Sequence, residues 1–162
     1  KHVLKHLSPG FISYEWHDRG SDERQYCAPH VDLPIASIMR TKYGEYPEYH
    51  TSLDTLGKVV TEQGLSGGFN VLRVALEVLE NNTYPTVKVL CEPQLGKRGL
   101  YPTLSTKDVN EEVRLMMNLI TWSDGSKSLL EIAEICGVPI WDLYSLLEKM
   151  VSSDLISVTD PQ

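Results

Sequence analysis

Three consecutive helical periodicities occupy the last third of this sequence, and their order constrains the fold more than any other feature. Residues 108–122 carry apolar side chains at spacings of three and four, which predicts an amphipathic helix. The inward positions are Val109, Val113, Met116, Met117 and Ile120. Asp124-Gly125 then predicts a turn that ends this first helix.

A second and a third helix follow, each with its own boundary signals. Ser128 followed by Glu131 is a capping box, which typically stabilises a helix start by about 1 kcal/mol. Gly137 predicts the end of that helix, and Pro139 lies near the start of the next. The third helix has the inner face Leu143, Leu146, Leu147 and Met150. With a short strand predicted at 155–158, this is the order of a winged helix.

The charge of this region argues against nucleic acid as a partner. Residues 107–162 hold four Lys/Arg against ten Asp/Glu, so this region carries −6 of the whole-chain charge of −7. In the predicted recognition helix, residues 139–151, Lys149 stands against Asp142 and Glu148. Because DNA binding rests on several Lys/Arg–phosphate contacts, we expect this helix to pack against protein instead, within the same chain or between two copies.

The first two thirds of the chain mix strand, helix and loop patterns. Residues 11–16 and the apolar run 34–39 predict strands, the second of them buried, and residues 66–80 predict an amphipathic helix. A further strand is predicted at 86–91, followed by a Gly- and Pro-containing linker at 92–105. The expected fold is therefore α/β, with one domain over residues 1–104 and the winged helix over 105–162.

Bulk composition sets the class of protein. The 162 residues are 41% hydrophobic, which is enough for a packed core. The three cysteines, Cys27, Cys91 and Cys136, show no CxxC spacing, so we expect neither a disulfide framework nor a thiolate zinc site. A reducing cytoplasm is the expected compartment, and no membrane association is expected because no apolar run approaches the roughly 20 residues of a spanning helix.

Two short loops flank the predicted strand 34–39 and carry the residues best suited to chemistry. The first reads GSDERQY and contains Asp22; the second reads YHTSLDT and contains His50. Carboxylate oxygen and imidazole nitrogen are both zinc ligands, and Asp54 is a candidate partner for the second ring nitrogen of His50. The residues alone leave the alternative open, because a loop Asp is more often a turn former and a lone His is more often structural. The pair His2 and His6 is expected on a surface helix.

The segments GSDERQY, LPIASIMRT and GEYPEYHTSLDTL together resemble the end of the catalytic domain in co-catalytic zinc aminopeptidases, whose superfamily includes glutaminyl-cyclase-like enzymes. The closer resemblance is to a bacterial aminopeptidase-like family, often associated with polysaccharide-biosynthesis loci, that ends in a winged helix. The resemblance implies that Asp22 and His50 are metal ligands, one for each of two zinc ions. The other ligands and the general-base Glu would precede residue 1.

The activity implied by the resemblance is metal-assisted hydrolysis of a peptide or amide bond. In that reading Arg24, Tyr26 and Tyr49 flank the ligands and could orient substrate or stabilise an oxyanion, although packing within the loops is the favoured alternative for all three. The expected partners are a peptide or amide substrate and the N-terminal part of the same protein, with self-association left open. The alternatives are a non-catalytic interaction module and, third, a DNA-binding regulator.

Overall fold

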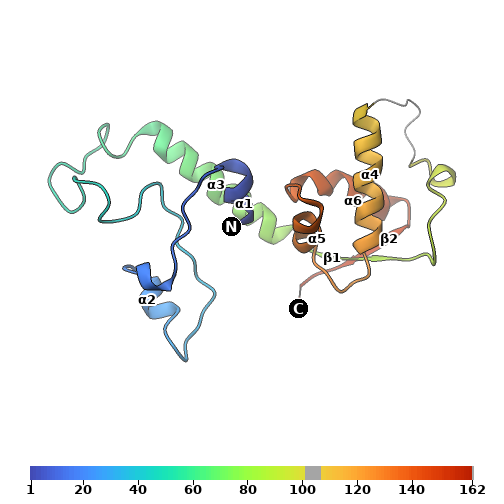
Figure 1. The fold of residues 1–162 in the computed structure, drawn as a ribbon, viewed down its shortest axis with the longest axis horizontal. Coiled ribbons are helices and arrows are strands. Elements are labelled where there is room, and N and C mark those ends of the chain that lie inside the picture. The colour runs from blue at the N-terminus through green and yellow to red at the C-terminus, as the bar shows by residue number, and fades with distance from the viewer. Residues whose placement is uncertain (101–106, 162) are drawn as a thin grey trace. The chain divides into compact units, whose positions relative to one another are not determined.

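The computed structural model describes residues 1–100 and 107–161, with the first four residues of the helix at 107 described by their backbone (Figure 1). Its contacts divide the chain into two compact units. Unit 1 comprises Lys1 and residues 3–74, and unit 2 comprises His2 and the chain from Ala75 onward. Each unit is described separately below.

Unit 1 consists mainly of ordered loops joined by helices. The short helices are α1 (His2–Leu7) and α2 (Glu23–Tyr26), with a 3-10 turn at Trp16–Asp18 between them. The long helix α3 (Glu62–Glu80) contains the predicted helix 66–80 and begins four residues earlier. Val74 and Val78 are buried on one side of α3, and the sequence of the helix continues into unit 2.

The two strands predicted in unit 1 are not present. Residues 11–15 and 34–39 have no regular secondary structure, and Trp16 instead begins the 3-10 turn. Ile35, Ile38 and Met39 are 43%, 43% and 37% exposed, so the expectation of a buried strand was wrong. The physical reason is that a strand requires a neighbouring strand for its backbone groups, and the one sheet found among the described residues contains β1 and β2 of unit 2.

Unit 2 contains the predicted succession of helices. They are α4 (Lys107–Trp122), α5 (Leu129–Cys136) and α6 (Trp141–Ser152), followed by β2 (Ile156–Thr159). The strand β1 (Tyr84–Val87) pairs with β2 in antiparallel register, Tyr84 opposite Thr159 and Val87 opposite Ile156. This arrangement of three helices and a two-stranded sheet confirms the winged-helix prediction and the mixed α/β class.

Because β1 pairs with β2, this unit begins earlier in the sequence than predicted. β1 begins and ends earlier than the predicted strand 86–91, and it belongs to the same sheet as the last strand of the chain. The segment predicted as a linker includes a 3-10 turn at Leu95–Arg98, and Leu95 is only 2% exposed. Residues 101–105 of that segment lie outside the described residues. The predicted boundary between residues 104 and 105 therefore falls within the sequence range of unit 2.

The core of unit 2 matches the predicted inner face of α6 and part of that of α4, where Val113 and Met117 are half-buried and Leu119, which was not predicted to face inward, is fully buried. Leu143, Leu146, Leu147 and Met150 of α6 are all buried, as are Met116 and Ile120 of α4. The side chain of Val109, also predicted inward, lies outside the described side chains. The capping box is confirmed, because the Ser128 N–H donates to Glu131 Oε2 at 2.7 Å and the Glu131 N–H donates to Ser128 Oγ at 3.3 Å. Gly137 ends α5 with φ 71°, in the left-handed region.

Across the described residues, we find no helix that joins the length and the apolar character that crossing a bilayer requires.

Candidate active site

The loop that carries Asp22 is organised by its neighbour, Glu23. The Glu23 Oε1 accepts hydrogen bonds from the backbone N–H groups of Gly20, at 2.7 Å, and Ser21, at 3.0 Å. These two bonds favour the ionised carboxylate and lower the pKa of Glu23 from 4.5 to about 2. Asp22 lies between these donors and α2, immediately before the helix, with its side chain exposed.

Tyr43 extends this network to the segment that carries His50. Its hydroxyl lies 3.1 Å from Glu23 Oε1 and 3.1 Å from the Asp18 carbonyl oxygen. Partial burial and the bond to Glu23 raise the pKa of Tyr43. Its ring lies directly against Gly20, where an added Cβ would come within 2.5 Å of a ring carbon. Glycine is therefore required at position 20 for the tyrosine to reach the carboxylate.

His50 lies in a loop built from aromatic contacts. The His50 and Tyr49 rings stack with centroids 4.0 Å apart and planes 14° apart, while Tyr46 meets Tyr49 edge-on at 5.5 Å. The backbone of His50 is in the left-handed region, with φ 57°. The Asp54 carboxylate, predicted to hold the His50 ring, accepts a hydrogen bond of 3.3 Å from the Tyr46 hydroxyl. Asp54 thus supports the aromatic cluster to which His50 belongs.

The three candidate substrate-facing residues have unequal environments. The Arg24 Nε donates to the Ser21 carbonyl at 3.2 Å, so this guanidinium is engaged within its own loop. Tyr26 is 47% exposed, and Tyr49 is half-buried against His50.

The donor types of Asp22 and His50 fit a zinc ion, but their number does not complete a site. Both side chains are exposed, and no hydrogen bond joins either side chain to another residue among those the structure describes. Within the described part of the chain, no group of three or more His, Cys, Asp or Glu side chains is placed to hold a metal. These two residues can therefore supply only part of the four-ligand shell that zinc prefers.

Sequence reasoning missed Glu23 and Tyr43 as organising residues. A signal for Glu23 was present, because it stands three residues after Gly20 and bonds back to the Gly20 N–H in the manner of a capping box. The same pattern was used to predict Ser128 and Glu131. The role of Tyr43 depends on a contact across 20 residues, for which the sequence carries no local pattern.

His2 was also misplaced by sequence reasoning. It is 8% exposed rather than solvated, and its Nε2 accepts the buried Ile140 N–H at 2.9 Å. Its Nδ1 lies 2.5 Å from Glu134 Oε1, and its ring meets Trp141 edge-on. A histidine with both ring nitrogens engaged in this way is a structural residue and has no nitrogen left for a metal.

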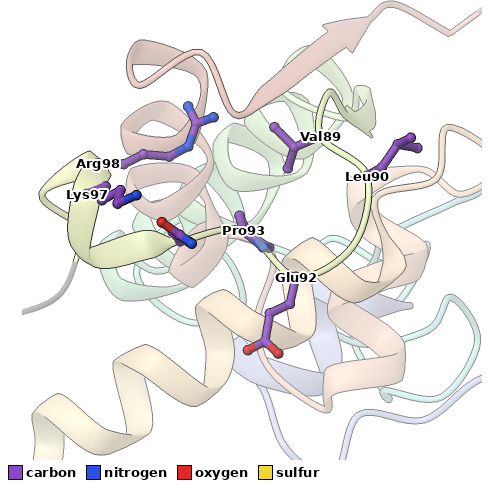
Figure 2. Close-up of a pocket in the computed structure, with 7 residues that line it drawn as sticks. Val89, Leu90, Glu92, Pro93, Lys97 and Arg98 are labelled. Atoms are coloured by element: carbon purple, nitrogen blue, oxygen red, sulfur yellow. The ribbon is translucent and has the colours of Figure 1, made fainter.

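A shallow cavity of about 350 Å³ occurs in unit 2, between the end of β1 and the 3-10 turn at Leu95–Arg98 (Figure 2). In Figure 2 the Glu92 side chain points away from Lys97 and Arg98. The Arg98 Nη1 donates to the Ser153 carbonyl at 2.8 Å, so this guanidinium is engaged in a hydrogen bond within unit 2. The predicted site residues do not line this cavity. Its seven lining residues are Val89, Leu90, Glu92, Pro93, Gln94, Lys97 and Arg98.

The fold of unit 2 defines a winged-helix protein, and comparison with known families supports this class. Residues 82–158 match a winged helix-turn-helix family. Residues 1–82 match the family described as "Domain of unknown function (DUF4910)", and the chain belongs to that family.

Two relatives connect the chain with peptidases. It is 37% identical over 138 residues to a Clostridium acetobutylicum protein named "Putative polysaccharide biosynthesis protein with aminopeptidase-like domain", covering 84% of this chain and 31% of that protein. A crystal structure of a "putative peptidase" from Clostridium acetobutylicum matches 98% of this chain and 34% of its own, at 30% identity and a TM-score of 0.84. The chain thus spans about a third of the length of these relatives. Their names support the peptidase-like character expected from the sequence.

Proposed function

We propose that the chain forms the C-terminal part of a zinc-dependent aminopeptidase-like hydrolase of the co-catalytic superfamily, acting on peptide or amide bonds. The observation that carries this proposal is the 37% identity to a protein named for its aminopeptidase-like domain. Asp22 and His50 would each contribute a ligand, from loops that present both side chains to solvent. Zinc bound there supplies Lewis-acid activation of a substrate carbonyl.

The remaining ligands and the general base would come from the N-terminal part of the same protein. The exposed apolar side chains of unit 1 support this part of the proposal, because further polypeptide would cover them. Five apolar residues of the segment 31–39 are 37–53% exposed: Val31, Leu33, Ile35, Ile38 and Met39. Burying such a surface against further polypeptide is favourable by roughly 25 cal/mol for each Å² of apolar area. On this proposal the isolated chain binds substrate weakly and has no turnover.

The winged helix, on this proposal, packs against protein rather than DNA. Lys149, the basic residue of α6, forms an ion pair of 2.8 Å with Glu112 of α4. Asp142 and Glu148 of the same helix are exposed and would repel phosphates. No observation on unit 2 favours a regulatory role in transcription.

The test uses the complete natural polypeptide, purified with its metal. We expect about two zinc ions per chain by inductively coupled plasma mass spectrometry, and hydrolysis of an aminoacyl-anilide. Asp22→Ala and His50→Ala should each lower the zinc content and abolish turnover. Matched controls are Asp32→Ala and His30→Ala, because both residues are exposed and His30 shares the left-handed backbone of His50, with φ 72°. Full zinc content in Asp22→Ala and His50→Ala would contradict the ligand assignment.

A further inference from the structure

We infer that Glu23 and Tyr43 form a brace that holds the Asp22 loop and the His50 loop in a fixed relation, and that both are positioning residues for the metal site. This inference rests on the proposed function for its chemical meaning. Its structural part concerns contacts within unit 1 and can be tested separately.

The Asp22 side of the brace is defined by the Glu23 carboxylate. Oε1 accepts the Gly20 and Ser21 N–H groups, and Oε2 accepts the Ser37 hydroxyl at 3.3 Å. Ser37 lies in the segment 34–39, and Gly20 and Ser21 directly precede Asp22. One carboxylate therefore fixes the backbone on the N-terminal side of Asp22 and ties it to a segment 14 residues away.

The His50 side is reached through Tyr43. Its hydroxyl joins Glu23 Oε1, and Tyr43 belongs to the same non-helical segment as His50. Within that segment Tyr49 stacks on His50 at 4.0 Å. The contacts of Glu23 thus reach the loop of His50 at Tyr43, and Gly20 leaves room for the tyrosine ring.

This geometry explains why the Glu23 carboxylate stands beside a proposed metal ligand without being one. Glu23 is committed to two backbone donors and a serine hydroxyl, and it is shared with Tyr43. Ligands held by fixed neighbours are already close to their bound geometry, so less conformational entropy is lost when the metal binds. Changes in residues that orient ligands typically weaken metal binding by about 10–100-fold.

The experiment compares Tyr43→Phe and Glu23→Gln with wild type in the complete natural polypeptide. Tyr144→Phe is the matched control, because it also removes a tyrosine hydroxyl but lies in unit 2, outside residues 18–26 and 44–51. Hydrogen exchange followed by mass spectrometry is measured on peptides covering residues 18–26 and 44–51, and zinc affinity is measured by chelator competition.

We expect both brace variants to speed exchange in both peptides and to weaken zinc binding about tenfold, at the lower end of that range, with Tyr144→Phe matching wild type. Gly20→Ala, which displaces the tyrosine ring but keeps the carboxylate and the hydroxyl, should act in the same direction. Unchanged exchange in both peptides for Tyr43→Phe overturns the brace. Faster exchange with unchanged zinc affinity overturns the positioning role. A wild-type protein that binds no zinc instead contradicts the proposed function, and the exchange data still decide the brace.

Discussion

The two units of this chain are held together by different interactions. Unit 2 buries an apolar core from three helices and both strands, including the fully buried Leu119, Leu143 and Leu155. Among the described residues of unit 1, Val3 and Val74 are the buried apolar side chains, and its loops are joined by polar and aromatic contacts such as those of Tyr43. Unit 2 therefore has what a small domain needs to fold alone, whereas unit 1 leaves much of its apolar surface exposed.

The largest effect on the free energy of unfolding is expected from a substitution that leaves a cavity in the core of unit 2. Leu119 of α4 is 0% exposed, so Leu119→Ala should lower the free energy of unfolding by about 3 kcal/mol. Chemical denaturation followed by tryptophan fluorescence measures this, because Trp122 and Trp141 both lie in unit 2. Leu72→Ala in unit 1, where the leucine is 52% exposed, is the control and should change stability by less than about 0.5 kcal/mol. Equal effects would contradict the comparison.

A smaller loss is expected at His2, which belongs to unit 2 by its contacts. His2→Ala removes the acceptor of the Ile140 N–H and leaves that buried donor unpaired at the start of α6. An unsatisfied buried donor costs about 1–3 kcal/mol, so we expect a loss of about 2 kcal/mol in the same denaturation assay. His17→Ala, at an exposed position in unit 1, should leave the midpoint unchanged. If His2→Ala left the free energy of unfolding unchanged, α6 would not depend on this contact.

The capping box of α5 gives a third, pH-dependent effect. Ser128→Ala should destabilise unit 2 by about 1 kcal/mol at neutral pH, with the exposed Ser145→Ala as control. The Ser128 N–H and then its hydroxyl lower the pKa of Glu131 below its ordinary 4.5. Because the folded pKa is the lower one, the stability that the carboxylate contributes is present above pH 4.5 and is lost as the pH falls through the folded value.

The measurement is the difference in the free energy of unfolding between wild type and Glu131→Gln as a function of pH. This difference should be constant near neutrality and should become smaller below pH 4.5. A difference that grows on acidification would show that the carboxylate does not stabilise the helix start in its ionised form.

The sequence predicted unit 2 better than unit 1 for a physical reason. The boundaries of α5 and the inner face of α6 follow from local signals such as Ser128, Gly137 and Leu146, and the folded unit buries the predicted face of α6. The strand at 34–39 was predicted from its apolar character, but a strand also depends on a partner that is not found among the described residues. Local sequence specifies helices more completely than it specifies pairing.

The candidate site shows the same limit. Asp22 and His50 were chosen from short motifs, and the structure places both in exposed loops. The contact between Glu23 and Tyr43 that joins those loops spans 20 residues, which no local pattern encodes. The assignment of the two residues as ligands stays a prediction until the metal content is measured.

The smallest effect in this chain is expected on the outward face of α3, and it sharpens the comparison most. Leu65, Phe69, Leu72 and Leu76 are spaced by four, three and four residues and are 52–70% exposed. Phe69→Ser should therefore change the stability of residues 1–162 by less than about 0.5 kcal/mol. In the complete natural polypeptide the same substitution should cost about 3 kcal/mol or more if further polypeptide covers this face, because burial of a phenylalanine would then be lost. Thermal or chemical unfolding of both forms, with and without the substitution, makes the comparison. Equal and small effects in the two would mean that this stripe stays in contact with water, and that the apolar surface of unit 1 is not an internal interface of a longer protein.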